Sequence, residues 1–157
     1  MRKLLFGLLV VAMVVAGCGD DDDASGDEGG GASVSVVLSD PFGPTPGQLA
    51  VEPDPSSAAA GQVEFVAKNQ GGDVHELVIV KGDDPTALPT DEYGAVIEDD
   101  LPEDDFIGEI ALVDAGTEES ASFDLDAGSY ILFCNILSIP FSHFDDGDGM
   151  VNTLTVT

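Results

Sequence analysis

The chain has 157 residues and a formal net charge of −27, because 31 aspartates and glutamates stand against only four lysines and arginines. Its length suits one domain of ordinary size together with a terminal extension. Such an excess of acid nearly excludes a nucleic-acid-binding role, since binding to phosphates needs a basic surface. The charge instead favours either a basic partner or adaptation to a salty or acidic habitat.

The first segment, residues 1–17, is predicted to be a secretory signal that lies outside the fold. A short basic start is followed by an almost unbroken apolar run from Leu4 to Ala16, which is too short for a comfortable transmembrane span. The run ends in Val15-Ala16-Gly17-Cys18, which resembles a bacterial lipoprotein signal. The resemblance implies cleavage before Cys18 and lipid attachment to it, so that acyl chains would anchor the protein at a membrane surface. The alternative is an ordinary signal peptide in which Cys18 has no role.

Residues 18–32 are predicted to form an acidic, flexible tether. They contain four consecutive aspartates, Asp20 to Asp23, and then mainly Gly, Ser, Asp and Glu, with no large apolar side chain. Such a segment buries too little surface to offset its ordering entropy, and its like charges extend it. A metal-binding acidic tail is the alternative interpretation.

The remaining part, residues 33–157, shows the alternation of apolar and polar side chains that is typical of half-buried β-strands. Turns rich in Pro, Gly, Asn and Asp separate the apolar runs, and no long helix is indicated. Seven or eight short strands in one domain predict an all-β fold, namely an antiparallel β-sandwich with Greek-key connections. The strands are predicted at residues 33–39, 48–52, 62–68, 74–80, 106–113, 120–125, 130–134 and 151–157.

One internal segment breaks this pattern. Residues 82–105 contain ten acids between Asp83 and Asp105, no lysine or arginine in that interval, and three prolines. We expect a loop excursion there, with a short helical turn around Glu92 to Glu98.

The stretch from Tyr130 to Thr157 carries the candidate chemistry. A strand-like run leads to Cys134, and the following loop returns His143 and Met150 before the last strand. Thiolate, imidazole and thioether form a soft ligand set that suits copper better than magnesium or calcium. Cys134 also needs an explanation, because it has no disulfide partner in an exported chain if Cys18 carries lipid. The alternative role for Cys134 is that of a small buried hydrophobe.

The rare ligand residues form one consistent set. Without its signal and apart from Cys18, the chain holds one cysteine, two histidines and one methionine: Cys134, His75, His143 and Met150. His75 begins a strand directly after a turn, and the other three surround the last loop, so a sandwich can bring them together at one end. They match a trigonal His₂Cys copper site with a weak axial methionine. Backbone N–H groups near Asn135 and Ile136 could donate hydrogen bonds to the sulfur and tune the reduction potential.

Two segments extend this pattern, Asn69-Gln70-Gly71-Gly72-Asp73-Val74-His75-Glu76-Leu77 and Gly128-Ser129-Tyr130-Ile131-Leu132-Phe133-Cys134-Asn135-Ile136. Together with His143 and Gly149-Met150 they resemble the cupredoxins, the small blue (type 1) copper proteins such as plastocyanin and azurin. The resemblance spans residues 33–157. It implies a Greek-key sandwich that binds one type 1 copper ion, with His75, Cys134 and His143 as strong ligands and Met150 as the axial ligand.

The spacing of the ligands departs from the small members of that family. Eight residues separate Cys134 from His143, and six separate His143 from Met150. The first gap is closer to that of the copper-containing nitrite reductases, and the second is long even for those. Asp145, Asp146 or a backbone carbonyl are the alternatives to Met150 in the axial position.

These features predict a copper-binding electron-transfer protein rather than an enzyme. Copper oxidases and nitrite reductases need further copper bound by additional histidines, and this chain has only two. A rigid set of sulfur and nitrogen ligands suits both Cu(I) and Cu(II), so single electrons pass with little rearrangement. Three alternatives stay open: a copper-delivery protein of the same fold without redox partners, a metal-free structural sandwich, and a zinc site on the same residues.

The expected partner is a redox protein of basic character, such as a cytochrome or an oxidase. Apolar residues between Ile136 and Phe141 would form a rim beside an exposed edge of His143, which suits docking of such a protein. We expect a monomer that contacts the membrane only through its lipid anchor. It would be exported and held at the outer face of the cell membrane, or on its periplasmic side.

Overall fold

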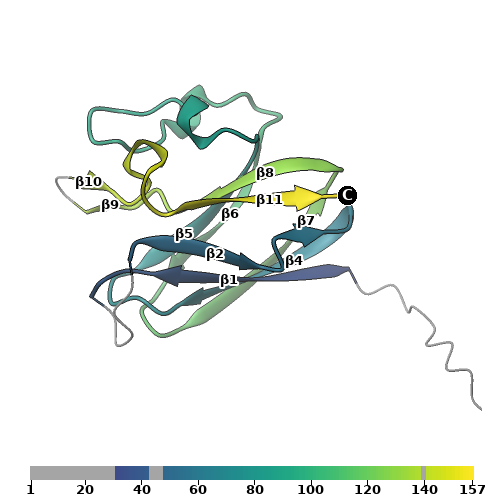
Figure 1. Cartoon of the computed structure of the whole chain (residues 1–157), viewed down its shortest axis with the longest axis horizontal. Coiled ribbons are helices and arrows are strands. Elements are labelled where there is room, and N and C mark those ends of the chain that lie inside the picture. Colours follow the sequence, from purple (N-terminus) through teal and green to yellow (C-terminus); the bar gives the residue numbers. More distant parts are fainter. Residues whose placement is uncertain (1–30, 43–47, 139–140) are drawn as a thin grey trace, which may run out of the picture.

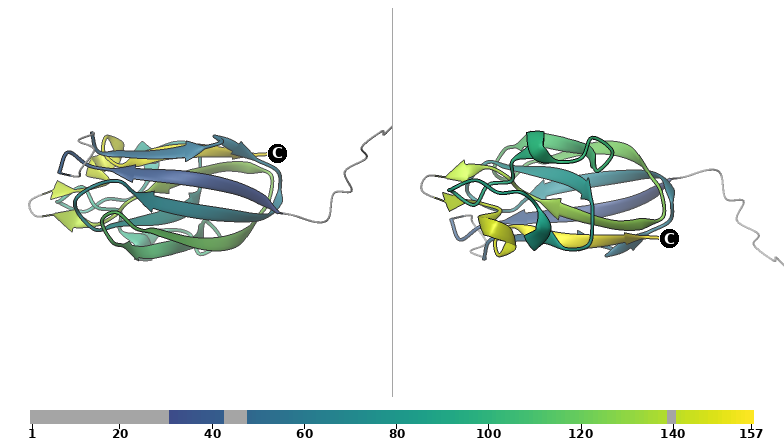
Figure 2. Two further views of the ribbon diagram at one scale, coloured as in Figure 1. Left: turned by 90° about the horizontal axis from the view of Figure 1, so that it is seen from below. Right: turned by 90° about the horizontal axis from the view of Figure 1, so that it is seen from above.

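The computed structural model describes residues 31–42, 48–138 and 141–157. The signal, the lipid-attachment site at Cys18 and nearly all of the predicted tether therefore lie outside the described residues. Within these ranges the chain forms a sandwich of two β-sheets (Figures 1 and 2). It contains eight strands of five or more residues, three strands of two residues and three short 3₁₀ helices. None of the helices in the described ranges is long and apolar enough to cross a membrane.

The first sheet has four strands in the order β2-β1-β4-β7. Strands β1 and β4 run parallel, with Ala32 opposite Val63 and Leu38 opposite Asn69, and the other two pairings are antiparallel. Pro53 lies within β2, where it is tolerated because β2 is an edge strand. The bounds are β1 (Ala32–Ser39), β2 (Ala50–Asp54), β4 (Gly61–Asn69) and β7 (Glu118–Leu125).

The second sheet has five strands in the order β3-β11-β8-β5-β6, and its short edge strand β3 runs parallel to β11. A separate two-stranded hairpin, β9 and β10, projects from the end of the sandwich at which β11 begins (Figure 1). The bounds are β3 (Ser57–Ala58), β5 (His75–Lys81), β6 (Phe106–Val113), β8 (Gly128–Phe133), β9 (Leu137–Ser138), β10 (Phe141–Ser142) and β11 (Val151–Val156).

The predicted all-β sandwich is confirmed, and its eight longer strands begin and end within two residues of the predicted ranges. The two parallel pairings depart from the fully antiparallel arrangement that we predicted. Between β1 and β4 the chain forms β2 and then crosses to the other sheet as β3, and a connection of this length allows the two strands to pair in parallel.

The main core lies between the facing sheets, where alternate side chains of each strand are buried. Phe65 and Tyr130 are the largest fully buried side chains within it. The Tyr130 hydroxyl donates a hydrogen bond to the carbonyl of Asp126, at 2.9 Å, and so ties the start of β8 to the preceding turn.

A second, smaller core covers the outer face of β5 and β8. Val78, Val80, Ile131 and Phe133 point into it, and the 82–105 excursion closes it with Val96, Leu88 and Leu101. The excursion lies above β8 in Figure 1. Because both faces of β5 and β8 are covered, their sequences are continuously apolar instead of alternating.

The helical turn predicted at Glu92 to Glu98 is wrong. The excursion instead contains two 3₁₀ helices, η1 (Pro85–Ala87) and η2 (Glu98–Asp100). Asp84 caps η1 by accepting a hydrogen bond from the backbone N–H of Thr86, and proline occupies the first position of η1. A third such helix, η3 (Asp145–Gly147), follows β10.

Candidate metal centre

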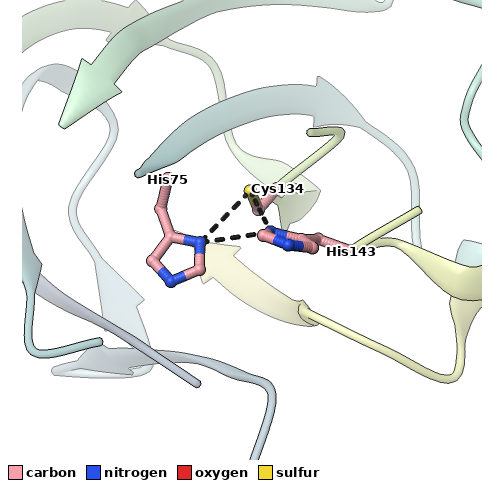
Figure 3. Close-up of side chains that lie close together, drawn as sticks. All are labelled: His75, Cys134 and His143. Carbon is pink, nitrogen blue, oxygen red and sulfur yellow. Dashed lines mark hydrogen bonds between the residues drawn. The ribbon is translucent and has the colours of Figure 1, made fainter. Parts of the chain in front are cut away.

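Three of the predicted ligands lie together at the end of the sandwich from which β9 and β10 project (Figure 3). His75 is the first residue of β5, Cys134 directly follows β8, and His143 directly follows β10. The Nδ1 atoms of the two histidines are 3.2 Å apart. The Sγ atom of Cys134 lies 3.7 Å from Nδ1 of His75 and 3.5 Å from Nδ1 of His143. All three side chains are buried, so the cluster is shielded from water.

The separations of these three atoms fit a bound metal ion. Typical bonds are about 2.0 Å to imidazole nitrogen and about 2.3 Å to thiolate sulfur. At bond angles of about 105–120°, such bonds place the two nitrogens about 3.2–3.5 Å apart and each nitrogen about 3.4–3.7 Å from sulfur. The observed distances fall within these ranges, and a sulfur with two imidazoles is a donor set that suits copper or zinc.

Met150 lies close to this cluster. Its side chain is fully buried and belongs to the same core as Cys134. Its backbone N–H donates to the carbonyl of His143 at 2.6 Å, and its carbonyl accepts from the N–H of Cys134 at 3.1 Å. The preceding residue has to be glycine, because a Cβ atom on Gly149 would collide with the carbonyl oxygen of His143. Axial ligation by Met150 stays a prediction; Asp145, one of its alternatives, is exposed.

The sulfur of Cys134 accepts a hydrogen bond from the backbone N–H of Glu76 at 3.5 Å. Burial raises the pKa of the Cys134 thiol to about 12, although hydrogen bonds from the backbone of Glu76 and Ile136 act in the opposite direction. The N–H of Asn135, which we expected to face the sulfur, donates instead to Oε1 of Glu76 at 3.0 Å. Without a metal, the thiol is therefore protonated at neutral pH.

Each imidazole is also held at its outer nitrogen. Nε2 of His75 lies 2.9 Å from Oδ2 of Asp40, and Nε2 of His143 lies 3.0 Å from Oγ of Ser138. Burial lowers the pKa of His75, and the hydrogen bond and charge of Asp40 oppose this effect. Burial also lowers the pKa of His143, and the neighbouring His75 lowers it further. Both rings are therefore neutral at pH 7, which is the state that binds metals.

Sequence reasoning did not identify three residues that support the cluster: Asp40, Ser138 and Asn69. The Asn69 side chain is buried, and its Nδ2 donates to the carbonyls of Asp73 and Val113, both at 2.8 Å. Its Oδ1 accepts from the backbone N–H of Gly71, also at 2.8 Å. These bonds fix the turn that leads into His75. The only signal in the sequence was the place of Asn69 at the start of a turn.

A second amide joins the cluster to the 82–105 excursion. Nδ2 of Asn135 donates to the carbonyl of Val96 and to Oε1 of Glu98, each at 2.9 Å. Its Oδ1 accepts from the N–H of Val96 at 2.7 Å. The residue that follows the cysteine ligand is therefore fixed against the covering segment.

The predicted exposed edge of His143 is wrong. Only 5% of His143 is exposed, and the hydroxyl of Ser138 lies 3.0 Å from its Nε2 atom. A pocket of about 400 Å³ is lined in part by His143. Two exposed apolar side chains lie on this end of the molecule, Phe42 (74% exposed) and Leu137 (42% exposed). Residues 139 and 140 of the predicted apolar rim lie outside the described residues. The pocket is lined by Asp40, Pro41, Phe42, Leu49, Asp73, Ser138, Ser142 and His143.

Binding of one divalent metal ion at pH 7 should release about one proton, as counted from the pKa values of its ligands. The proton comes from Cys134, whose pKa of about 12 keeps the thiol neutral, and the neutral histidines release none. Metal affinity should therefore rise with pH through the neutral range. Calorimetric titrations in two buffers of different ionisation enthalpy measure this number. No proton release would mean that the metal-free protein already holds a thiolate.

No protein-family model matches the sequence, and no curated protein is significantly similar to it. Solved structures are similar in fold. Auracyanin from Roseiflexus castenholzii, solved in its dithionite-reduced form, is 20% identical, with a TM-score of 0.54 over 82% of this chain and 99% of auracyanin. Auracyanin A from Chloroflexus aurantiacus, described as a "blue" copper protein, is 20% identical, with a TM-score of 0.50 over 82% and 100% of the two chains.

An azurin from Methylomonas sp. strain J is 16% identical, with a TM-score of 0.51 over 80% of this chain and 98% of the azurin. At these identities the likeness shows the fold alone. The chain therefore has a cupredoxin-like β-sandwich, with a cluster of two histidines and one cysteine at one end.

Proposed function

We propose that the protein transfers single electrons through one type 1 (blue) copper ion bound by His75, Cys134 and His143, with Met150 as the axial ligand. The observation that supports this proposal is the convergence of one sulfur and two Nδ1 atoms, 3.2–3.7 Å apart, from three separate segments of a buried sandwich end. Thiolate favours Cu(I) and imidazole is acceptable to both oxidation states, so the set serves a one-electron cycle.

The surroundings of the cluster suit electron transfer better than catalysis. Asp40 and Ser138 hydrogen-bond to the outer nitrogens of the two imidazoles, and the N–H of Glu76 donates to the sulfur, so little has to move when the charge of the ion changes. Burial excludes water from the ligands. Among the described residues no second cluster of three His, Cys, Asp or Glu groups offers a further metal site. The protein is accordingly proposed to be a carrier and not an enzyme.

We also propose that the protein is exported, anchored to the membrane by lipid, and bound by a basic redox partner. Residues 1–17 would direct export, Cys18 would carry lipid, and the acidic segment up to residue 32 would hold the domain away from the outer face of the membrane. The electron donor or acceptor would be a basic redox protein, such as a cytochrome or oxidase, that docks at the end of the sandwich bearing Phe42 and Leu137. The excess of acidic residues supports this choice by attracting a basic partner.

The test is a titration of the purified chain that lacks residues 1–17 with Cu(II), followed by visible spectroscopy and voltammetry. We expect one copper per chain, an intense blue or green thiolate-to-copper band, and reversible one-electron reduction. A parallel titration with Zn(II) should give a colourless complex and serves as the control. Stoichiometric copper without the band contradicts a type 1 site, and a band without reversible reduction favours copper delivery over electron transfer.

A further inference from the structure

Asp40 is not one of the proposed metal ligands, but its carboxylate contacts the ligand His75. Asp40 follows β1, is 1% exposed and receives hydrogen bonds from three backbone N–H groups. Phe42 donates at 2.6 Å, Gly72 at 2.9 Å and Asp73 at 3.0 Å. The fourth contact is Nε2 of His75, at 2.9 Å from Oδ2.

These contacts decide which nitrogen of His75 carries the proton. Backbone N–H groups only donate, so three of them converging on one carboxyl group require it to be an acceptor. Oδ1 accepts from the N–H groups of Phe42 and Gly72, and Oδ2 accepts from those of Gly72 and Asp73, so both oxygens of the carboxylate serve as acceptors. Nε2 of His75, which faces Oδ2, must therefore be the donor and carry the proton. Its Nδ1 then presents a lone pair toward Cys134 and His143.

The packing around this contact requires glycine at position 71. A Cβ atom on Gly71 would collide with Oδ2 of Asp40 and would lie 2.8 Å from Nε2 of His75. Glycine at this position therefore permits the carboxylate and the imidazole to meet beneath the turn. Glycine is required here for lack of space and not for its backbone conformation, because the φ angle of Gly71 lies outside the left-handed region.

The other histidine is held differently. Nε2 of His143 faces the hydroxyl of Ser138, which can either donate or accept a hydrogen bond. Ser138 therefore permits both neutral forms of His143, whereas Asp40 permits only one form of His75. The two imidazoles also differ in charge environment, because only His75 has an anion in contact with its outer nitrogen.

We propose, building on the copper function proposed above, that Asp40 is a positioning residue that presents Nδ1 of His75 to the metal and increases the preference of the centre for Cu(II) over Cu(I). A carboxylate that accepts the outer N–H makes the imidazole a stronger donor. Cu(II) carries one more positive charge than Cu(I), so the added donor strength and the buried negative charge stabilise Cu(II) more.

The test compares Asp40→Asn with Asp73→Asn. Both variants remove one carboxylate that lines the same pocket, but only Asp40 contacts a ligand. We expect Asp40→Asn to weaken Cu(II) binding about 10- to 100-fold, the usual effect of losing such a partner, with a smaller loss for Cu(I). A tenfold loss of preference for Cu(II) raises the one-electron potential by about 59 mV. Asp73→Asn should change the affinity for Cu(II) and the affinity for Cu(I) each by less than about threefold, because the charge of a partly exposed carboxylate is screened by solvent and salt.

A second readout needs no copper. Two-bond ¹H–¹⁵N spectra of the metal-free wild-type protein report which nitrogen of His75 is protonated, and we expect Nε2. A proton on Nδ1 overturns the inference, as do equal shifts of potential in the two variants. If Asp40→Asn does not fold, Asp40→Ser, which keeps an acceptor without the charge, takes its place.

The two proposals fail in different ways. A wild-type chain without a thiolate-to-copper band contradicts the electron-transfer function. In that case the His75 spectrum and the Co(II) affinities of wild type, Asp40→Asn and Asp73→Asn still decide the role of Asp40. A normal copper band with an unchanged potential in Asp40→Asn rejects the role of Asp40 alone.

Discussion

Replacing Cys134 with serine should lower the affinity for Cu(II) by on the order of a thousandfold, equivalent to about 4 kcal/mol, and should remove the thiolate-to-copper band. Cys134 supplies the only sulfur anion of the cluster. A serine hydroxyl gives up its proton far less readily than a thiol, so it offers copper a neutral and weak ligand. The two imidazoles remain, so the variant should still bind metal weakly.

The same substitution should leave the sandwich folded. A hydroxyl is close in size to a thiol, and it can accept the hydrogen bond that the N–H of Glu76 gives to the sulfur. The cost in stability should be about 1–2 kcal/mol, the scale of placing a partly satisfied hydroxyl in an apolar site. Urea unfolding of the metal-free proteins measures it. Ser138→Ala, which keeps all three ligands, should retain the band, and a band that survives in Cys134→Ser would remove Cys134 from the copper site.

The ligands could be predicted from the sequence because their residue types are rare in it. Outside the predicted signal and Cys18 there are one cysteine, two histidines and one methionine, so the candidates for a soft site were limited to Cys134, His75, His143 and Met150. The structure brings the first three together. Most of the strands could also be predicted from the sequence, because alternation of apolar and polar side chains shows which face of a strand meets the core.

The partners of the ligands could not be predicted in this way. Asp40 is one of 31 acidic residues, and its contact with His75 bridges 35 positions of sequence. That contact exists because β1 and β4 pair in parallel, which brings the ends of both strands to the same edge of the sheet. The parallel pairing of β1 and β4 depends on how the chain crosses between the two sheets, and the local sequence of neither strand predicts it.

Replacing Asn69 with aspartate should destabilise the metal-free protein by about 3 kcal/mol or more, the scale of a buried polar group left facing the wrong partners. Nδ2 of Asn69 donates to the carbonyls of Asp73 and Val113. A carboxylate oxygen in its place would face two carbonyl oxygens without any proton between them. Because the turn at residues 69–73 also supplies two of the N–H groups that hold Asp40, copper affinity should fall as well.

The matched control is Gln70→Glu, which makes the same change from amide to carboxylate one residue further along, at an exposed position. It should change stability by less than about 0.5 kcal/mol, as is usual for surface substitutions. Urea unfolding of both variants between pH 7 and pH 5 separates the effect of the new negative charge on stability from the effect of the lost amide hydrogen bonds. Burial raises the pKa of the new carboxyl group at position 69, so the folded variant takes up a proton before the unfolded chain does. Its deficit should therefore shrink as pH falls, since the protonated group regains one donor. A deficit equal to that of Gln70→Glu would show that the Asn69 amide does not hold the turn.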